Sequence, residues 1–320
     1  MTVTSLISKF ATKSGKPLKV GTGSGTKWQW AKKANPEVDL HQELVDQLVL
    51  AINTGFTHID SAEVYTTGPE VGAALKQSGV KREDMWITSK YTPGLGTQQE
   101  ALSTGPLTSL DKLLKELKTD YLDMFLVHCP FIDPKYSKGQ TRATVWAEMI
   151  EAKKSGKVRY IGVSNYAIPH LEECFEIANG DAEYYPSFNQ IEFHPYLQNQ
   201  TNDIVKFCQD HEILVEAFGP LTPLFRIKEG DKEITDHPLT KLLPELSEKY
   251  GKTQAQILLR YTLQKDILPI TTSSKEERIR ESLEIYNFKL DNEDVNKIDT
   301  VGATYKFRGF FEGMYDKALV

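Results

Sequence analysis

Four ionisable side chains have the types needed to transfer a proton to a carbonyl oxygen. They are Asp60, Tyr65, Lys90 and His128. A phenol has a pKa of about 10 and is a poor acid at neutral pH, but a nearby ammonium group favours the phenolate and lowers that pKa. A carboxylate such as Asp60 keeps a buried lysine protonated, and an imidazole can orient a carbonyl oxygen. Together these groups would aim a proton donor at a developing alkoxide.

Each of the four residues also has a commoner explanation when it is taken alone. Asp60 would be a helix N-cap or a turn residue, and Tyr65 a half-buried ring with a satisfied hydroxyl. Lys90 would be solvated, and His128 would be a hydrogen-bonded structural histidine. The chemical interpretation therefore requires a fold that brings these side chains together.

The chain repeats one unit, in which an amphipathic helix and a short turn precede a short apolar run. In residues 41–60, Leu44, Leu48 and Ile52 recur at helical spacing, and Gly55 occupies the position of a left-handed C-cap. Segments 107–128 and 146–165 repeat this arrangement. We predict eight strands, at residues 19–22, 56–60, 85–89, 121–128, 158–163, 188–192, 213–217 and 267–270.

Eight apolar strands that alternate with helices favour parallel strands joined by crossovers. The predicted fold is a single α/β domain over residues 1–320, a (β/α)8 TIM barrel. No GxGxxG motif follows the first strand, which weakens a doubly wound alternative. Residues 10–20 predict an N-terminal β-hairpin that turns at Ser14 and Gly15. In a barrel, Asp60, Lys90 and His128 would meet at the C-terminal ends of the strands, where such folds place their chemistry.

Several sequence blocks now identify a resemblance. HIDSAEVY, ITSKY, DYLDMFLVHCP, IGVSN, NQIEFHPYLQNQ and TTSSKEERI resemble the aldo-keto reductase superfamily in order and spacing over residues 18–290. The resemblance implies a carbonyl reductase that uses NADPH and no metal. It implies that Tyr65 is the general acid, that Lys90 and Asp60 tune its pKa, and that His128 positions the substrate carbonyl.

The resemblance also implies a cofactor site. Ser164, Asn165 and Gln190 match residues that bind the nicotinamide carboxamide, and Phe218 in VEAFGPL matches an aromatic ring that stacks on the nicotinamide. Without the flanking motifs, Phe218 would be interpreted as core packing. The remaining positions assigned to this part of the site, from two loops and the catalytic set, are Gly25, Thr26, Lys27, Asp60, Pro220 and Leu221.

TTSSKEERIRES resembles the segment that binds the adenosine 2′-phosphate. Arg278 matches an arginine that can stack on adenine and pair with phosphate. Thr272 replaces the usual lysine, Ser273 is retained, and Lys275 with Ser274 can restore a cationic cradle. We therefore expect NADPH rather than NADH, against the simpler view of a solvated helix start.

Departures from the family pattern concern the substrate. Cys129 replaces a common tryptophan after the histidine, Tyr91 follows the lysine, and Thr67–Gly68 replaces an Asn-Glu pair. We expect Trp28, Tyr91, Cys129 and Phe131 to line an apolar pocket, with the aromatic tail 307–315 over the barrel mouth. Together with GTKW and LPITTSSK, these features resemble most the fungal branch of conjugated polyketone and α-keto amide reductases. That branch implies activated dicarbonyl substrates such as ketopantoyl lactone, isatins and α-keto amides or esters.

Composition limits the partners. The net charge of −6 and pI of about 5.7 argue against nucleic acid and anionic membranes. The apolar runs fall short of a membrane span, and the start of the chain lacks a secretory signal. Three scattered cysteines form no disulfide framework or metal motif, which favours a reducing cytoplasm. We expect a small-molecule carbonyl substrate and a monomer or weak homodimer.

Three alternatives remain open. The first is an aldose/xylose-type aldehyde reductase of the same superfamily. The second is a lyase or aldolase in which Lys90 forms a Schiff base. The third is a nucleotide-binding regulatory subunit, against which the intact set of four ionisable residues argues.

Overall fold

Eight parallel strands close into a barrel. The computed structural model describes residues 5–35, 37–94, 99–229, 232–316 and 319. The strands are β1 (Gly21–Gly23), β2 (His58–Asp60), β3 (Trp86–Tyr91), β4 (Leu122–Val127), β5 (Val158–Ser164), β6 (Phe188–Glu192), β7 (Leu214–Phe218) and β10 (Leu268–Thr271). Their order around the barrel is β1-β10-β7-β6-β5-β4-β3-β2, and all eight contacts are parallel. The predicted fold class is confirmed.

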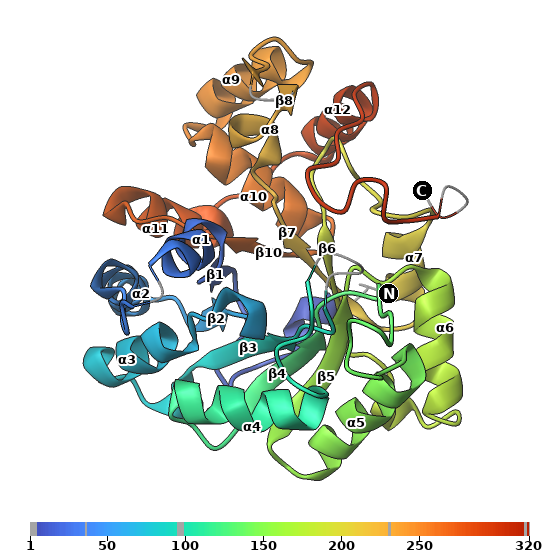
Figure 1. The fold of residues 1–320 in the computed structure, drawn as a ribbon. Coiled ribbons are helices and arrows are strands. Elements are labelled where there is room, and N and C mark those ends of the chain that lie inside the picture. The colour runs from blue at the N-terminus through green and yellow to red at the C-terminus, as the bar shows by residue number, and fades with distance from the viewer. Residues whose placement is uncertain (1–4, 36, 95–98, 230–231, 317–318, 320) are drawn as a thin grey trace.

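Helices follow the strands and form an outer layer around the barrel (Figure 1). They are α1 (Thr26–Ala34), α2 (Gln42–Thr54), α3 (Gly68–Ser78), α4 (Pro106–Leu117), α5 (Arg142–Lys154), α6 (Ile168–Ile177), α7 (Ile204–Asp210), α9 (Leu239–Tyr250), α10 (Gln254–Gln264), α11 (Glu276–Leu283) and α12 (Asn292–Ala303). Short 3-10 turns are η1 (Leu6–Lys9), η2 (Glu63–Tyr65), η3 (Arg82–Asp84), η4 (Ala182–Tyr184) and η5 (Glu284–Tyr286). Within the described residues, no helix is long and apolar enough to cross a membrane.

Local sequence explains where these helices begin and end. Helix α4 starts with Pro106 at its first position, where the missing N–H costs nothing, and buries Leu110, Leu113 and Leu117 on one face. Helix α2 ends at Gly55, whose φ of 120° is accessible to glycine and strained for other residues. The predicted periodicity and C-cap are therefore confirmed.

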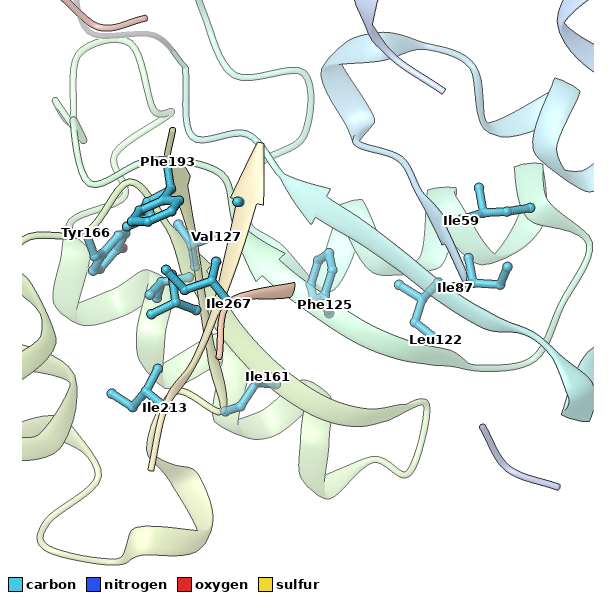
Figure 2. Packing of buried hydrophobic residues seen from close by; sticks show 14 of the residues in the cluster. Ile59, Ile87, Leu122, Phe125, Val127, Ile161, Tyr166, Phe193, Ile213 and Ile267 are labelled. Atoms are coloured by element: carbon cyan, nitrogen blue, oxygen red, sulfur yellow. The ribbon is translucent and has the colours of Figure 1, made fainter. Parts of the chain in front are cut away.

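Alternation along the strands separates two cores. Ile59, Ile87, Phe125 and Ile161 belong to the cluster between the strands and the helices (Figure 2). On each strand, the residues directly before and after these four point into the barrel, because successive strand side chains face opposite sides of a sheet. Thus Trp86 packs inside the barrel, whereas its neighbour Ile87 packs against the helical layer.

The predicted N-terminal hairpin closes the end of the barrel at which the strands begin. Ala11 and Pro17 form an antiparallel bridge, and Gly15 adopts a φ of 90° at the turn. Phe10 places its ring 4.5 Å from Phe188 and 6.2 Å from Trp86, both at the first positions of their strands. This apolar plug blocks one entrance to the barrel, so that the opposite rim remains for a site.

The chain after β7 contains elements that the sequence reasoning missed. They are the short helix α8 (Thr222–Phe225) and the two-stranded antiparallel sheet of β8 (Lys228–Glu229) and β9 (Lys232–Glu233). Elements of two to four residues carry too little periodicity to be recognised from a sequence.

Gly162 on β5 should be intolerant of a side chain. A Cβ there would lie 2.8 Å from Leu126 Cδ2 and 2.8 Å from the carbonyl oxygen of Phe188. We expect Gly162→Ala to lower the free energy of unfolding by about 1–3 kcal/mol, because overpacking displaces strand neighbours. Urea unfolding measures this change. The control is Gly23→Ala, whose Cβ would lie 3.8 Å from its nearest neighbour, the Thr271 carbonyl oxygen. Equal stability of the two variants would contradict the prediction.

Candidate active site

A buried ion pair joins the ends of β2 and β3. Lys90 Nζ lies 2.8 Å and 2.7 Å from the two carboxylate oxygens of Asp60 and 2.9 Å from the carbonyl oxygen of Ser61. Lys90 is fully buried and Asp60 is 5% exposed. Burial lowers the pKa of Lys90, but the charge and the hydrogen bonds of Asp60 act in the opposite direction, and the net shift of its pKa is upward. The ammonium group therefore stays charged, as the sequence predicted.

Tyr65 lies beside this pair on the 3-10 turn η2. Lys90 Nζ is 5.4 Å from the centre of the Tyr65 ring. Gly25 leaves room for that ring, because a Cβ at this position would lie 2.7 Å from Tyr65 Cε2. Burial raises the pKa of Tyr65, and Lys90 lowers it by less, so the net shift is upward. This result corrects the expected net lowering of the pKa: burial outweighs the ammonium group, and the phenol stays protonated.

His128, just after β4, completes the set. Its Nε2 lies 3.5 Å from Tyr65 Oη, and its Nδ1 lies 2.9 Å from Thr92 Oγ1. Asn165 Nδ2 donates to the carbonyl oxygen of His128 at 2.9 Å. Burial, assisted by Lys90, lowers the pKa of His128 well below its usual range. The imidazole is therefore neutral at physiological pH, and the barrel brings together all four predicted ionisable groups.

The predicted carboxamide-binding residues form one hydrogen-bonded chain. Ser164 Oγ donates to the carbonyl oxygen of Gln190 at 2.7 Å, and Asn165 Nδ2 donates to Ser164 Oγ at 3.0 Å. Gln190 Nε2 donates to Asp60 Oδ1 at 2.8 Å and to Glu216 Oε2 at 3.0 Å. Among the described residues, Gln190 Oε1 receives no hydrogen bond. This free acceptor can take an amide N–H, so the donor and acceptor set fits a nicotinamide carboxamide.

The aromatic tail after α12 packs on this rim, as predicted. Glu192, at the end of β6, accepts hydrogen bonds from the backbone N–H groups of Gly309 and Phe310, at 2.8 Å and 3.1 Å. Phe310 packs edge-on against Phe218, with ring centres 5.2 Å apart. Tyr315 donates to the carbonyl oxygen of Asn165 at 2.9 Å. The tail therefore contacts the strand ends that carry the site.

The predicted phosphate segment comprises the loop between β10 and α11 and the first turn of α11. Ser274, Lys275 and Arg278 are exposed, and Arg278 faces the Phe225 ring at 5.7 Å. Among the described residues, Lys275 and Arg278 make no ion pair, so their charges are available to an anion. Thr272 differs, because its hydroxyl donates to the Gly23 carbonyl oxygen and accepts from Gln47 Nε2, both at 3.1 Å.

The other predicted cofactor residues lie at the starts of α1, α8 and α11, on the same rim. Gly25 is the N-cap of α1, with Thr26 and Lys27 in its first turn. Pro220 and Leu221 follow β7, directly before α8. Ser273 accepts a hydrogen bond from the backbone N–H of Lys275 at 3.1 Å.

The predicted substrate-pocket residues divide into two groups. Phe131 is half-buried and lies 5.1 Å from Tyr315, ring centre to ring centre. Trp28 is nearly buried and donates its indole N–H to Gln47 at 3.1 Å. Tyr91 and Cys129 have no exposed surface, and Tyr91 belongs to the cluster that faces the helices. The structure therefore does not bring these last two to the surface of the rim, and their pocket role remains a prediction.

The Thr67–Gly68 departure has a structural explanation. Thr67 Oγ1 lies 3.0 Å from Ser24 Oγ, which also donates to Ser61 Oγ at 3.0 Å. A Cβ at Gly68 would lie 2.6 Å from Glu116 Oε2 of helix α4. The space next to Gly68 is thus occupied by a carboxylate from elsewhere in the chain.

Sequence reasoning missed Thr92, Gln200 and Glu216. Gln200 Nε2 donates to Asn165 Oδ1 at 2.9 Å, whereas Thr92 and Glu216 contact His128 and Gln190. The sequence contains one signal that could have identified Glu216: a glutamate inside an apolar strand is rarely buried without a partner.

We expect the ring of His128 to stay neutral as the pH falls from about 8 to about 5, because a depressed pKa leaves the base deprotonated above it. A pH titration of the imidazole resonances by NMR measures this, with His128→Asn providing the assignment. A protonation midpoint at the ordinary histidine pKa would contradict the depressed pKa of the buried His128 imidazole.

Comparisons with known proteins agree with this geometry. The Aldo/keto reductase family matches residues 19–303. A Saccharomyces cerevisiae protein named NADPH-dependent alpha-keto amide reductase is 41% identical over 297 residues, covering 92% of this chain and 90% of that protein. A Schizosaccharomyces pombe NAD/NADP-dependent indole-3-acetaldehyde reductase is 38% identical, with coverages of 86% and 90%.

A solved structure extends the comparison to three dimensions. The Bombyx mori aldo-keto reductase in complex with NADP superposes with a TM-score of 0.72 and 27% identity, covering 91% of this chain and 92% of that one. The (β/α)8 barrel and the rim described above thus agree with the family match. The chain belongs to the aldo/keto reductase family and is an oxidoreductase that acts on carbonyl groups.

Proposed function

We propose that this protein is an NADPH-dependent carbonyl reductase with Tyr65 as the proton donor. The observation that carries the proposal is the position of the protonated phenol, beside the Lys90–Asp60 pair and 3.5 Å from His128 Nε2. A carbonyl oxygen near both Tyr65 and His128 would meet two hydrogen-bonding groups at once. NADPH, when bound, supplies the hydride that reduces the carbonyl carbon.

The residues of the chain then handle the proton. Thr92, by donating to His128 Nδ1, would hold the imidazole as the tautomer with its proton on Nε2, which donates to the substrate oxygen. Tyr65 transfers its proton to the developing alkoxide, and the product is an alcohol. Lys90 stabilises the resulting phenolate. Asp60 keeps Lys90 charged, and the Lys90–Asp60 pair as a whole carries no net charge. Solvent then restores the phenol.

The cofactor would lie along the rim from β5 to α11. Ser164, Asn165 and Gln190 would hold the carboxamide, and Phe218 would stack on the nicotinamide. Lys275 and Arg278 would hold the 2′-phosphate, since two exposed cations at a helix N-terminus suit a dianion. The name of the budding-yeast relative, an NADPH-dependent reductase, supports this choice.

The proposed substrates are activated ketones: α-keto amides and esters, ketopantoyl lactone and isatins. Phe131 and the tail residue Phe310 are half-buried aromatic rings near the strand ends, and an adjacent carbonyl makes the target carbon more electrophilic. The relative named alpha-keto amide reductase supports this class. Reduction of aldehydes is the second candidate, favoured by relatives named glyoxal reductase and indole-3-acetaldehyde reductase.

We also propose a cytoplasmic enzyme that is a monomer or a weak homodimer. Support for the compartment comes from Cys129, Cys174 and Cys208, which are all buried and unpaired. Cell fractionation tests the first statement, and light scattering at several protein concentrations tests the second.

Tyr65→Phe should lower kcat for a carbonyl panel by roughly 100- to 10,000-fold, because the ring is kept while the proton donor is lost. NADPH oxidation, followed by absorbance, measures turnover, and quenching of protein fluorescence measures cofactor binding, which should survive. Tyr160→Phe is the matched control, since this ring packs against Phe10 near the hairpin plug. Wild-type rates for Tyr65→Phe would refute the proposed function.

Lys275→Ala should raise the KM for NADPH roughly tenfold and change the KM for NADH by less than about twofold, because only NADPH carries the 2′-phosphate. Steady-state kinetics with both cofactors measures the ratio. Lys206→Ala on α7 controls for the loss of an exposed lysine. Equal effects on the two cofactors would remove Lys275 from the phosphate site.

A further inference from the structure

Glu216 is a buried carboxyl group that the proposed proton transfer does not use. It lies on β7, two residues before Phe218, with its side chain inside the barrel and no exposed surface. Glu216 Oε2 accepts one N–H of Gln190 at 3.0 Å. Among the described residues, Glu216 Oε1 has no hydrogen-bond partner. A charged carboxylate with an unpartnered oxygen would be costly here.

Gln190 connects Glu216 to the catalytic ion pair. Its Nε2 donates one hydrogen to Glu216 and the other to Asp60 Oδ1, at 3.0 Å and 2.8 Å. An amide nitrogen has two hydrogens, so both are used. This arrangement directs Gln190 Oε1 away from the two carboxyl groups, and it links Glu216 to Lys90 through a single amide and a single carboxylate.

The titratable neighbours of Glu216 provide too little positive charge for a second carboxylate. Strand β2 contributes His58 and Asp60, and β3 contributes Lys90, whose ammonium group is bound to Asp60. The adjacent strands β6 and β10 place Gln190 and Leu268 opposite Glu216, and neither titrates.

His58 cannot supply the missing charge. Its Nε2 lies 3.9 Å from Glu216 Oε1 and 3.1 Å from Thr88 Oγ1, and its Nδ1 lies 3.3 Å from the Lys19 carbonyl oxygen. Burial lowers the pKa of His58 to about 4, so the imidazole is neutral. With Asp60 and Lys90 cancelling, an ionised Glu216 would leave one net negative charge inside the barrel.

We propose that Glu216 is a positioning residue for carbonyl reduction: as an uncharged carboxyl group it holds Gln190 in place and keeps the Lys90–Asp60 pair electrically balanced. Ionisation of Glu216 would add a negative charge that acts on Lys90, offset part of the ammonium charge and so disfavour the phenolate that forms on proton donation. Burial, together with Asp60, raises the pKa of Glu216 to about 8, and the weaker opposing effects come from Gln190 and Lys90. The uncharged form therefore predominates below this pH and is lost above it.

The kinetic arm of the test rests on the proposed function. The second arm does not depend on that function, because its infrared spectra measure no turnover. The first arm compares the pH dependence of kcat/KM for the wild type and Glu216→Gln. Glutamine keeps an acceptor for Gln190 but cannot ionise. Between about pH 7 and about pH 9, kcat/KM of the wild type should fall roughly tenfold, and kcat/KM of Glu216→Gln should fall less than about twofold. Asp294→Asn, which removes a buried carboxylate on α12, should retain the wild-type profile.

The second arm uses the wild-type protein without cofactor. Infrared difference spectra between the same two pH values should show loss of one protonated carboxyl band, and Glu216→Gln should lack that band. Glu216→Ala, which removes the acceptor altogether, should also raise the KM for NADPH, since Gln190 is released.

The outcomes separate the two proposals. An unchanged alkaline limb in Glu216→Gln, or a wild-type spectrum without a titrating carboxyl band, would overturn the role of Glu216. Wild-type turnover by Tyr65→Phe would instead overturn the proposed function while the infrared result stood. If Glu216→Gln fails to fold, the wild-type spectrum alone still decides whether a carboxyl group titrates in this range.

Discussion

The buried contact between Lys90 and Asp60 is the interaction on which the candidate site depends. An isolated charge is very costly in an apolar interior, and each of these two is retained because the other neutralises it. The ammonium group uses its hydrogens on both Asp60 oxygens and on the Ser61 carbonyl oxygen. Loss of either partner would leave an uncompensated buried charge, which typically destabilises a protein by about 3–5 kcal/mol. The pair therefore holds β2 and β3 together as well as serving the chemistry.

The barrel brings Lys90 and Asp60 together and buries the pair from solvent. Parallel register places Asp60 beside Thr88, so that Lys90, two residues further along β3, points to the same side. Apolar residues form the layer below, where Phe10 of the hairpin packs against Phe188. The inner faces of the strands therefore change from apolar at the hairpin end to polar at the opposite rim. Burial of the Tyr65 phenol at this rim raises its pKa although an ammonium group lies nearby.

Polar groups buried in such an interior need neighbours that satisfy their hydrogen bonds. Gln190 divides its two N–H groups between Asp60 and Glu216, and so connects two carboxyl groups without bringing them into contact. At the rim, Glu192 binds the backbone of the tail and thereby places Phe310 against the ring of Phe218. The same principle governs both places: a buried carboxyl group is held by N–H donors and organises the segment that supplies them.

The sequence by itself determined the eight strands, the helical periodicities and the residue types of the catalytic set, because these depend on local spacing and on motifs. It identified Asp60, Tyr65, Lys90 and His128, and burial of Asp60 and Lys90 follows from their place at barrel strand ends. Only the tertiary structure decided which effect controls the pKa of Tyr65, since burial and the Lys90 charge act in opposite directions. It alone revealed Glu216 as a neighbour of Gln190, because residues 26 positions apart meet only when β6 and β7 pair.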